Sequence, residues 1–382
     1  DFDGIDGPHQ LENAAFLPLL ADALRKEGFT EWNSSPYLPI DTLGFGSLYA
    51  FAQDPAMREL GREGMDFAYY LLAVHSQQGI FASSSGRTYI KEQFGNWSNC
   101  PSGLSWIGYG YGVPGHAGKG ITSYCLSDYE PPKEFAQWFS IPRGKEMICQ
   151  TTQGNDGYVD LYTYKTADYM MTSANDFHPG EPGHQENPFQ LTFNAVAQLW
   201  VTHPGERVLF GAARPSYWAG NGTLPKVNQY KAFAGLIYDI APEHPVDFTH
   251  LYLPSMEFDR CEVEDKWAFV QLGSAYAAVY CSNGMRMQDF GSNKDRECIA
   301  EGRRCIWLVR AAQADEFAAF EDFKAAMRGA ALDADAEGRR YRFVDPVYGE
   351  LRCQWGETLY VNDAPMQYSG FDNYGKLTMQ EK

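Results

Sequence analysis

The sequence has no apolar run that approaches the roughly 18 residues a membrane helix needs. Its eight cysteines include no C-x-x-C pair, which argues against zinc-ribbon and thioredoxin-like folds. No segment recurs at the roughly 20–50-residue period of repeat architectures. Basic residues are also scarce, because 31 Lys and Arg face 49 Asp and Glu, for a formal net charge of −18. Nucleic acid and membranes are therefore not expected as partners.

The same absences leave the cellular compartment open. An even number of cysteines permits disulfides, but their low density in a long chain suits a reduced protein equally well. No basic-then-apolar signal segment begins the sequence, and three N-x-S/T triplets begin at Asn33, Asn96 and Asn221. A secreted or periplasmic location is slightly favoured. Because a helical pattern starts within a dozen residues, we expect a segment or a separate chain to precede residue 1 and complete the helical domain.

Aromatic residues, in contrast, are abundant. They make up 15% of the chain, with 24 Tyr, 24 Phe and 9 Trp. Aromatic side chains favour β-strands, and flat rings also stack on the faces of sugars. The composition therefore indicates both a large β core and a carbohydrate cleft. With 382 residues, the chain can bury an ample core and is long enough for two or three domains.

The order of the elements is helices first and strands afterwards. Apolar residues recur at helical spacing in segments 11–28, 38–53 and 55–79, which are joined by short loops as in an α/α hairpin array. Residues 79–140 are rich in Gly, Ser, Tyr and Pro and are expected to form substrate loops. From about Lys145, short aromatic and β-branched segments separated by turns predict a large antiparallel β-sandwich, interrupted by one helix over 315–328.

Two polar motifs lie in the helical part. Glu12 and Asn13 stand at the head of the first helix, where they suit capping as well as they suit a binding site. The loop GFTEWNSSPY carries Glu31, Asn33 and Tyr37 between two helices. Such loops line one rim of an α/α array, where a cleft forms, although Tyr37 can equally anchor the next helix by packing.

A third polar motif, NDFHPGEPGHQENPFQLTF, immediately precedes a strand. It contains His184 and Gln185 among two His and two Glu side chains, an unusual density for a plain connection, although a hydrogen-bonded turn is the alternative. The segment SSSGRTYIKE adds Arg87 and Tyr89. The planar guanidinium of Arg suits a ligand carboxylate because it pairs bidentately, whereas a surface Arg in a Gly-Ser loop is the simpler interpretation.

These motifs together resemble the heparinase II/III-like family. ENAAF followed by GFTEWNSSPY resembles the family's Asn at a helix start and its E-x-N/S-x-x-Y loop, and GHQENPFQLTFNAVAQLWVTHPG resembles its sandwich segment. The resemblance implies an α/α toroid, an antiparallel sandwich and a catalytic triad of Asn13, Tyr37 and His184. Where the family often has further histidines, this chain has Ala14 and Glu186, so the motif does not support a structural metal in the sandwich, and no cofactor is expected.

The resemblance also sets the predicted organisation. It is an α+β multidomain fold, in which part of a toroid leads into a large antiparallel β-sandwich (supersandwich). The predicted domains are the C-terminal part of an α/α toroid with substrate loops (1–140), the sandwich (141–335) and a smaller terminal β-sheet region (336–382).

The implied activity is that of a polysaccharide lyase, a carbon–oxygen lyase that cleaves a uronic-acid-containing glycan by β-elimination. A base removes the C5 proton, an acid protonates the leaving glycosidic oxygen, and donors such as Asn13 and Arg87 stabilise the developing dianion. Substrate-binding residues are then Glu12, Glu31, Asn33, Arg87, Tyr89 and Gln185. The alternatives are a glycoside hydrolase on the same scaffold, which needs two carboxylates, and a non-catalytic glycan-binding protein.

Overall fold

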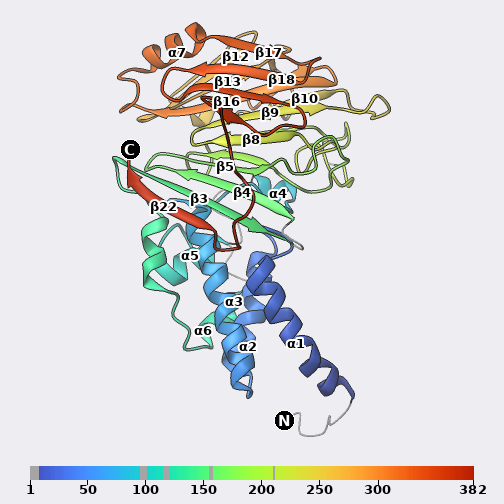
Figure 1. The fold of residues 1–382 in the computed structure, drawn as a ribbon, viewed down its shortest axis with the longest axis vertical. Helices are drawn as coiled ribbons and strands as arrows, with labels where there is room; N and C mark the ends of the chain where they lie inside the picture. The colour runs from blue at the N-terminus through green and yellow to red at the C-terminus, as the bar shows by residue number, and fades with distance from the viewer. Residues whose placement is uncertain (1–7, 95–100, 115–119, 155–157, 210) are drawn as a thin grey trace.

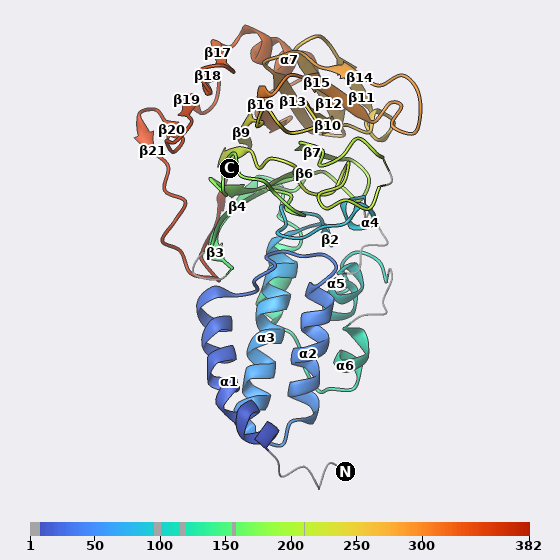
Figure 2. The same ribbon diagram turned by 90° about the vertical axis from the view of Figure 1, so that its right-hand side faces the viewer.

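The computed structural model describes residues 8–94, 101–114, 120–154, 158–209 and 211–382, with side chains from residue 18 onward. It is a mixed α+β protein with several antiparallel sheets and few helices (Figure 1). Most of the helices gather at one end of the molecule, and the sheets are stacked at the other, where one further helix also lies (Figure 2). No helix in the described ranges has both the length and the apolar composition needed to cross a bilayer.

Three helices form most of the N-terminal part. They are α1 (Pro8–Glu27), α2 (Leu38–Phe51) and α3 (Pro55–Val74). Asp54 caps α3 by accepting a hydrogen bond from the Ala56 amide at 2.8 Å, and Pro55 occupies the first turn, where its missing N–H costs nothing. A Cβ on Gly61 would lie 2.5 Å from the backbone nitrogen of Tyr49, so glycine allows α2 and α3 to approach closely.

The segment that joins the helices to the sheets is made of short elements. It contains β1 (Ser76–Gln77), β2 (Ile80–Phe81), α4 (Ile90–Gln93), α5 (Ser102–Tyr109), α6 (Ile121–Cys125) and a 3-10 turn, η2 (Lys133–Trp138). The region predicted as substrate loops therefore has some secondary structure of its own. These helices were not predicted from the Gly-rich sequence, because helices of four to eight residues are too short to show a helical period.

In the described part of the chain, the largest sheet has nine strands. In spatial order they are β14 (Arg286–Met287), β15 (Glu297–Glu301), β10 (Phe248–Tyr252), β7 (Gln198–Thr202), β6 (Phe189–Thr192), β5 (Met170–Asn175), β4 (Val159–Lys165), β3 (Lys145–Gln153) and β22 (Lys376–Glu381). Each neighbouring pair is antiparallel. The C-terminal strand thus returns to the first long strand of the β region.

Two further sheets complete the β region that the structure describes. The six-stranded sheet has the order β11 (Arg260–Val263), β12 (Trp267–Leu272), β13 (Ala275–Cys281), β16 (Arg304–Gln313), β9 (Phe233–Asp239) and β8 (Lys226–Tyr230). The five-stranded sheet comprises β17 (Leu332–Asp335), β18 (Arg340–Asp345), β19 (Gly349–Gln354), β20 (Tyr360–Val361) and β21 (Ala364–Pro365). Helix α7 (Phe320–Gly329) precedes β17 and starts five residues later than expected, because Ala314–Phe317 form a turn that closes on Gln313.

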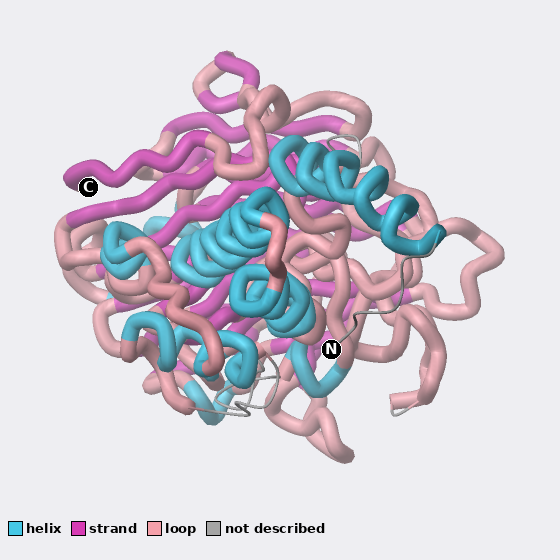
Figure 3. The backbone as a smooth tube through the Cα atoms, turned by 90° about the horizontal axis from the view of Figure 1, so that it is seen from below, coloured by secondary structure: helices cyan, strands magenta, loops and turns pink. Residues whose placement is uncertain are grey.

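The core has one part between the sheets and another between helices and sheet. Side chains of the nine-stranded and six-stranded sheets share a large apolar cluster. A second cluster joins α3 to β3 through Met147 and Cys149, and in Figure 3, seen from below, the helices lie in front of the strands. Lys165 of β4 is fully buried there and donates hydrogen bonds to the carbonyls of Ala73 and Trp138 at 2.9 and 2.7 Å. Helices and sheet are therefore tied by polar bonds as well as by apolar packing.

Two buried histidines give this core a predictable dependence on pH. Burial lowers the pKa of His75 to about 3, and burial together with neighbouring His244 lowers that of His203 to about 3. In the unfolded chain a histidine titrates near ~6.5, so between these values the unfolded state binds more protons. The free energy of unfolding is therefore expected to fall by about 2 kcal/mol per histidine when the pH is lowered from 7 to 5.

Denaturant unfolding at several pH values measures this effect. His75 Nδ1 shares one hydrogen bond with Thr163 Oγ1 at 3.0 Å. His75→Gln is therefore a matched variant, because glutamine can keep this hydrogen bond but does not titrate. Its stability should fall less steeply with acidification. A wild-type stability that stays level between pH 7 and 5 would contradict the account.

Candidate active site

Three segments that are distant in sequence meet where the helices adjoin the large sheet. They are 29–37 between α1 and α2, 82–89 after β2, and 176–188 between β5 and β6. The amide and carbonyl of Ser85 pair with those of Asn187 at 2.8 and 2.7 Å. The Thr88 amide donates to the Gln185 carbonyl at 3.0 Å. The polar motif ahead of β6 therefore lies directly beside the segment that carries Arg87 and Tyr89.

The loop that ends at Tyr37 is fastened to the same segment. The amide of Gly86 donates to the carbonyl of Trp32 at 2.8 Å, and Ser34 Oγ donates to the carbonyl of Arg87 at 3.2 Å. A Cβ on Gly86 would lie 2.6 Å from the indole nitrogen of Trp32. Because any larger residue would push the two segments apart, Gly86 is what allows Tyr37 and Tyr89 to approach each other.

The two tyrosines form the centre of the site. Their hydroxyl oxygens are 3.4 Å apart. The guanidinium carbon of Arg87 lies 5.2 Å from the ring centre of Tyr37, and that of Arg214 lies 5.4 Å from the ring centre of Tyr89. Arg87 in turn forms an ion pair with Glu31. Two phenols in contact are thus placed between two cations, one of which is partly neutralised.

These neighbours shift the pKa values of the two phenols in opposite directions. The hydrogen bond from Tyr37, together with the charges of Arg87 and Arg214, lowers the pKa of Tyr89 below its ordinary value. The hydrogen bond to Tyr89, with the charge that Tyr89 acquires, raises the pKa of Tyr37. Tyr89 is therefore the group that loses its proton first, and Tyr37 donates the hydrogen bond between them once Tyr89 is ionised. Opposed pKa shifts in one pair are a mark of acid–base partners.

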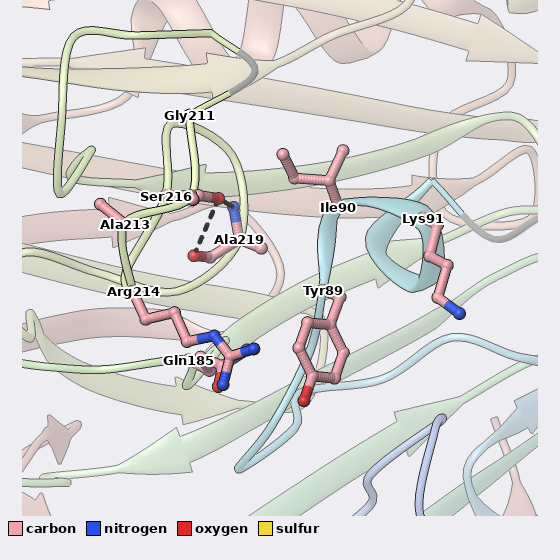
Figure 4. Close-up of a pocket in the computed structure, with 10 residues that line it drawn as sticks. Tyr89, Ile90, Lys91, Gln185, Gly211, Ala213, Arg214, Ser216 and Ala219 are labelled. Carbon is pink, nitrogen blue, oxygen red and sulfur yellow. Dashed lines mark hydrogen bonds between the residues drawn. The ribbon is translucent and has the colours of Figure 1, made fainter.

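The tyrosines are also shared walls of a row of three cavities. One of about 250 Å³ is lined by both tyrosines and by Lys91. A larger one of about 570 Å³ shares Tyr89 and Lys91 with it and adds Arg214 and Gln185 (Figure 4). A third of about 300 Å³ shares Tyr37 and is lined also by Glu31. Neighbouring cavities share Tyr89 or Tyr37 as a wall, and we call this row of three cavities the groove.

Asp41 stands at the end of the groove beyond Tyr37. It lies in the first turns of α2 and lines the same cavity as Glu31. Burial raises the pKa of Asp41 to about 7, with a contribution from the charge of Glu31. This carboxyl group is therefore partly protonated at neutral pH and can donate a proton.

The wall that carries Arg214 is held by a buried polar network. Tyr217 donates to Glu297 Oε1 at 2.6 Å, and the ring of Trp218 stacks on His250 with centroids 4.0 Å apart. Glu297 also contacts His250 Nδ1 at 2.6 Å. Although burial opposes it, these bonds hold the pKa of Glu297 below its usual range. The loop is therefore anchored at Tyr217, three residues after Arg214, whose side chain lines the groove.

Two polar side chains near the groove have atoms without a partner among the described residues. Asn33 is 1% exposed, has a positive φ of 48°, and neither atom of its amide is hydrogen-bonded. Gln185 donates to the Thr88 carbonyl at 3.1 Å, but its Oε1 is buried and unpaired. A buried polar atom left unpaired costs about 1–3 kcal/mol, and such costs concentrate at functional sites.

Of the residues predicted from sequence, Glu31, Arg87, Tyr37, Tyr89 and Gln185 are brought together at the groove. Glu12 and Asn13 lie on α1, but their side chains are outside what the structure describes. The end of α1 next to the sheets is its C-terminal end (Figure 2), so at 1.5 Å per residue the backbone of Asn13 is roughly 20 Å along the helix from that end. The catalytic role assigned to Asn13 stays a prediction.

His184 is placed differently from its neighbour Gln185. Its side chain is exposed, and its amide donates to Glu186 Oε2 at 2.5 Å. Gln185, the next residue, has the side chain that lines the largest cavity of the groove. The segment therefore reaches the site, whereas the role of the His184 ring stays a prediction.

Sequence reasoning did not single out Arg214, Lys91 or Asp41. Arg214 lies in the loop ARPSYWAGNG, about 125 residues beyond Tyr89, and nothing local links the two. Asp41 lies in the first turn of a helix, where an acid is ordinary. An Arg followed by Pro in an aromatic, Gly-rich loop was the available signal, and it is a weak one.

Within the described ranges, no three His, Cys, Asp or Glu side chains are grouped closely enough to hold a metal ion. No protein-family model matches the sequence, and a comparison with curated proteins likewise finds no match.

Proposed function

We propose that this chain is a polysaccharide lyase that cleaves a uronic-acid-containing glycan by β-elimination. The observation that carries the proposal is the contact between Tyr37 and Tyr89, whose pKa values are shifted in opposite directions at the centre of a groove. Elimination needs one group that accepts a proton and one that gives a proton within the reach of a single sugar linkage. A phenol pair with separated acidities supplies both.

In the proposed reaction Tyr89, as the phenolate, takes the C5 proton of the uronate. The electron pair of the C5–H bond becomes the C4=C5 double bond, and the bond from C4 to the glycosidic oxygen breaks. Tyr37 gives its proton to the leaving oxygen. The pair is then reversed, with Tyr37 as the phenolate, and transfer of the proton across the 3.4 Å contact from Tyr89 to Tyr37 restores the starting state.

The cations make this chemistry compatible with an acidic protein. A net charge of −18 repels a polyanion at long range, so a uronate needs local positive potential. Arg87 and Arg214 lie against the two rings, and Lys91 lines the cavities on either side of Tyr89. The same cations stabilise the charge that develops at C5 and its carboxylate.

The proposal includes the finer fold assignment. Helices α1–α3 are taken to belong to an α/α toroid, and the two larger sheets to form an antiparallel sandwich, as in the heparinase II/III-like family that the sequence motifs resemble. The convergence of the loop motif, the SSSGRTY segment and the GHQEN motif on one groove supports this assignment, because each comes from a different part of the chain.

A screen of uronate-containing polysaccharides tests the proposal. Elimination leaves a conjugated 4,5-unsaturated uronate, which absorbs in the far ultraviolet, and hydrolysis does not. We expect the absorbance to rise with at least one uronate-containing polysaccharide, whereas neutral polysaccharides should give no change. If new reducing ends appear without this absorbance, the chain is a hydrolase; if neither appears with any uronate-containing polysaccharide, the catalytic proposal fails.

A glycoside hydrolase is the second candidate, favoured by Asp41 and Glu31. Both line one cavity, and the raised pKa of Asp41, about 7, suits a general acid. Glu31 is then the partner carboxylate, and it forms an ion pair with Arg87. Asp41→Asn separates the candidates, because it should abolish hydrolysis but leave most of an elimination that depends on the tyrosines.

A further inference from the structure

We propose that the 570 Å³ cavity beside Tyr89 is a subsite for a carboxylated sugar and that Arg214 binds its carboxylate. The inference deepens the proposed function and rests on it, since it takes the ligand to be part of a uronate-containing glycan. It adds the orientation of the bound glycan, which places an acidic sugar at the Arg214 end of the groove and an uncharged sugar at the Asp41 end.

The first support is the state of Arg214. Among the described residues, no carboxylate lies within ion-pair distance of it, although the chain has far more acids than bases. Arg207 is a useful contrast, because it also lies over an aromatic ring, Phe248, at 5.4 Å, yet it pairs with Asp247 at 2.6 Å. Arg214 lies over Tyr89 at the same 5.4 Å without such a partner. Its charge is thus left for a ligand.

The second support is the distribution of charge along the groove. Among the described residues, the lining of the Arg214 cavity contains two cations, Arg214 and Lys91, and no carboxylate, although Lys91 is paired with Glu92 at 3.1 Å. The described lining of the cavity at the other end contains Glu27, Glu31 and Asp41 and no cation. Like charges juxtaposed in a site oppose binding, so the acidic end disfavours a second uronate, and the cationic end favours one.

The third support is that this cavity is a built site. Its volume falls within the roughly 300–1,000 Å³ of small-molecule pockets. Figure 4 shows the Arg214 guanidinium extended from its loop toward the ring of Tyr89, with Gln185 behind it. Gln185 is 3% exposed and has an unpaired Oε1 among the described atoms, which can accept a hydrogen bond from a sugar hydroxyl. Ser216 and Ala219, which also line the cavity, hydrogen-bond each other within the loop that carries Arg214.

Binding of monosaccharides tests the inference without any turnover. D-Glucuronate, with D-galacturonate as its epimer and D-glucose as the uncharged analogue, is titrated into the full chain and followed by NMR. We expect either uronate to bind roughly 10- to 100-fold more tightly than glucose, which is the usual size of a charge-assisted hydrogen bond. The preference should shrink as salt is added.

Three variants locate the effect. Arg214→Gln should remove the preference for uronate, Arg214→Lys should keep part of it because a point charge replaces a bidentate fork, and Arg207→Gln should leave it unchanged. Thermal unfolding checks that each variant is folded. Equal binding of glucuronate and glucose to the wild type, or an unchanged preference in Arg214→Gln, would overturn the inference, as would no uronate binding at all.

The outcome separates this inference from the proposed function. If polyuronates are not eliminated but glucuronate still binds through Arg214, the lyase proposal fails and the carboxylate subsite stands. If elimination occurs and uronate binding does not depend on Arg214, the subsite is wrong and the lyase proposal stands.

Discussion

Tyr89→Phe should lower turnover on a polyuronate by roughly 10²- to 10⁴-fold, the usual contribution of positioned proton transfer. The substitution keeps the ring that Arg214 lies against at 5.4 Å and removes only the hydroxyl that Tyr37 contacts. The free energy of unfolding should therefore change by about 1 kcal/mol or less. Steady-state kinetics with denaturant unfolding on the same sample compares the two effects.

Tyr360→Phe is the matched control for this variant. Tyr360 of β20 also lies beneath an arginine, Arg352, at 4.1 Å, but in the five-stranded sheet. Its loss of a hydroxyl should leave turnover unchanged. If Tyr89→Phe were as active as Tyr360→Phe, Tyr89 would not be the base, and the carboxyl groups at the other end of the groove would be the next candidates.

Tyr37→Phe should also reduce turnover by roughly 10²- to 10⁴-fold and should in addition shift the pH profile. In the proposed mechanism Tyr89 is the base, so kcat/KM should rise as the pH passes through its pKa. The hydrogen bond from Tyr37 is the largest cause that lowers this pKa, and its removal must raise it. The rising limb of the profile is therefore expected at higher pH in the variant than in the wild type.

The shift of the limb distinguishes a proton donor from a packing residue. A Tyr37 that only anchors α2 would leave the profile in place, even if the variant were less stable. A limb that moves to lower pH would contradict the direction of the coupling between the two phenols. The wild type and Tyr360→Phe, measured in the same buffers, give the reference position.

Much of the architecture follows from periodicity, but the pairing of its parts does not. The long helices α2 and α3 and the strands from Lys145 onward were predicted from the spacing of their apolar residues, and Asp54 and Pro55 also mark the start of α3. The return of β22 to β3 was not, since the segment that ends the chain carries no mark of its partner. The 336–382 region predicted as one unit is thus divided, with 332–365 in the five-stranded sheet and 376–381 in the nine-stranded one.

The site shows the same division between local and distant information. Glu31, Tyr37, Arg87 and Gln185 were named because their types and motifs indicate chemistry. The opposed pKa shifts of Tyr37 and Tyr89 could not be predicted, because they depend on a 3.4 Å contact and on Arg214 from another sheet connection. Short motifs name candidate groups, whereas their pKa values are set by neighbours that only the folded chain supplies.

The central claim, elimination by this tyrosine pair, is tested most directly by the masses of the products from a polyuronate digest. Elimination removes no water from solution, so each new non-reducing end should be lighter by one water than the corresponding product of hydrolysis, and it should carry the far-ultraviolet absorbance. The account predicts such fragments from the wild type and a strongly reduced yield from Tyr89→Phe. Fragments of the full hydrolysed mass, or unsaturated fragments formed equally fast by Tyr89→Phe, would contradict it.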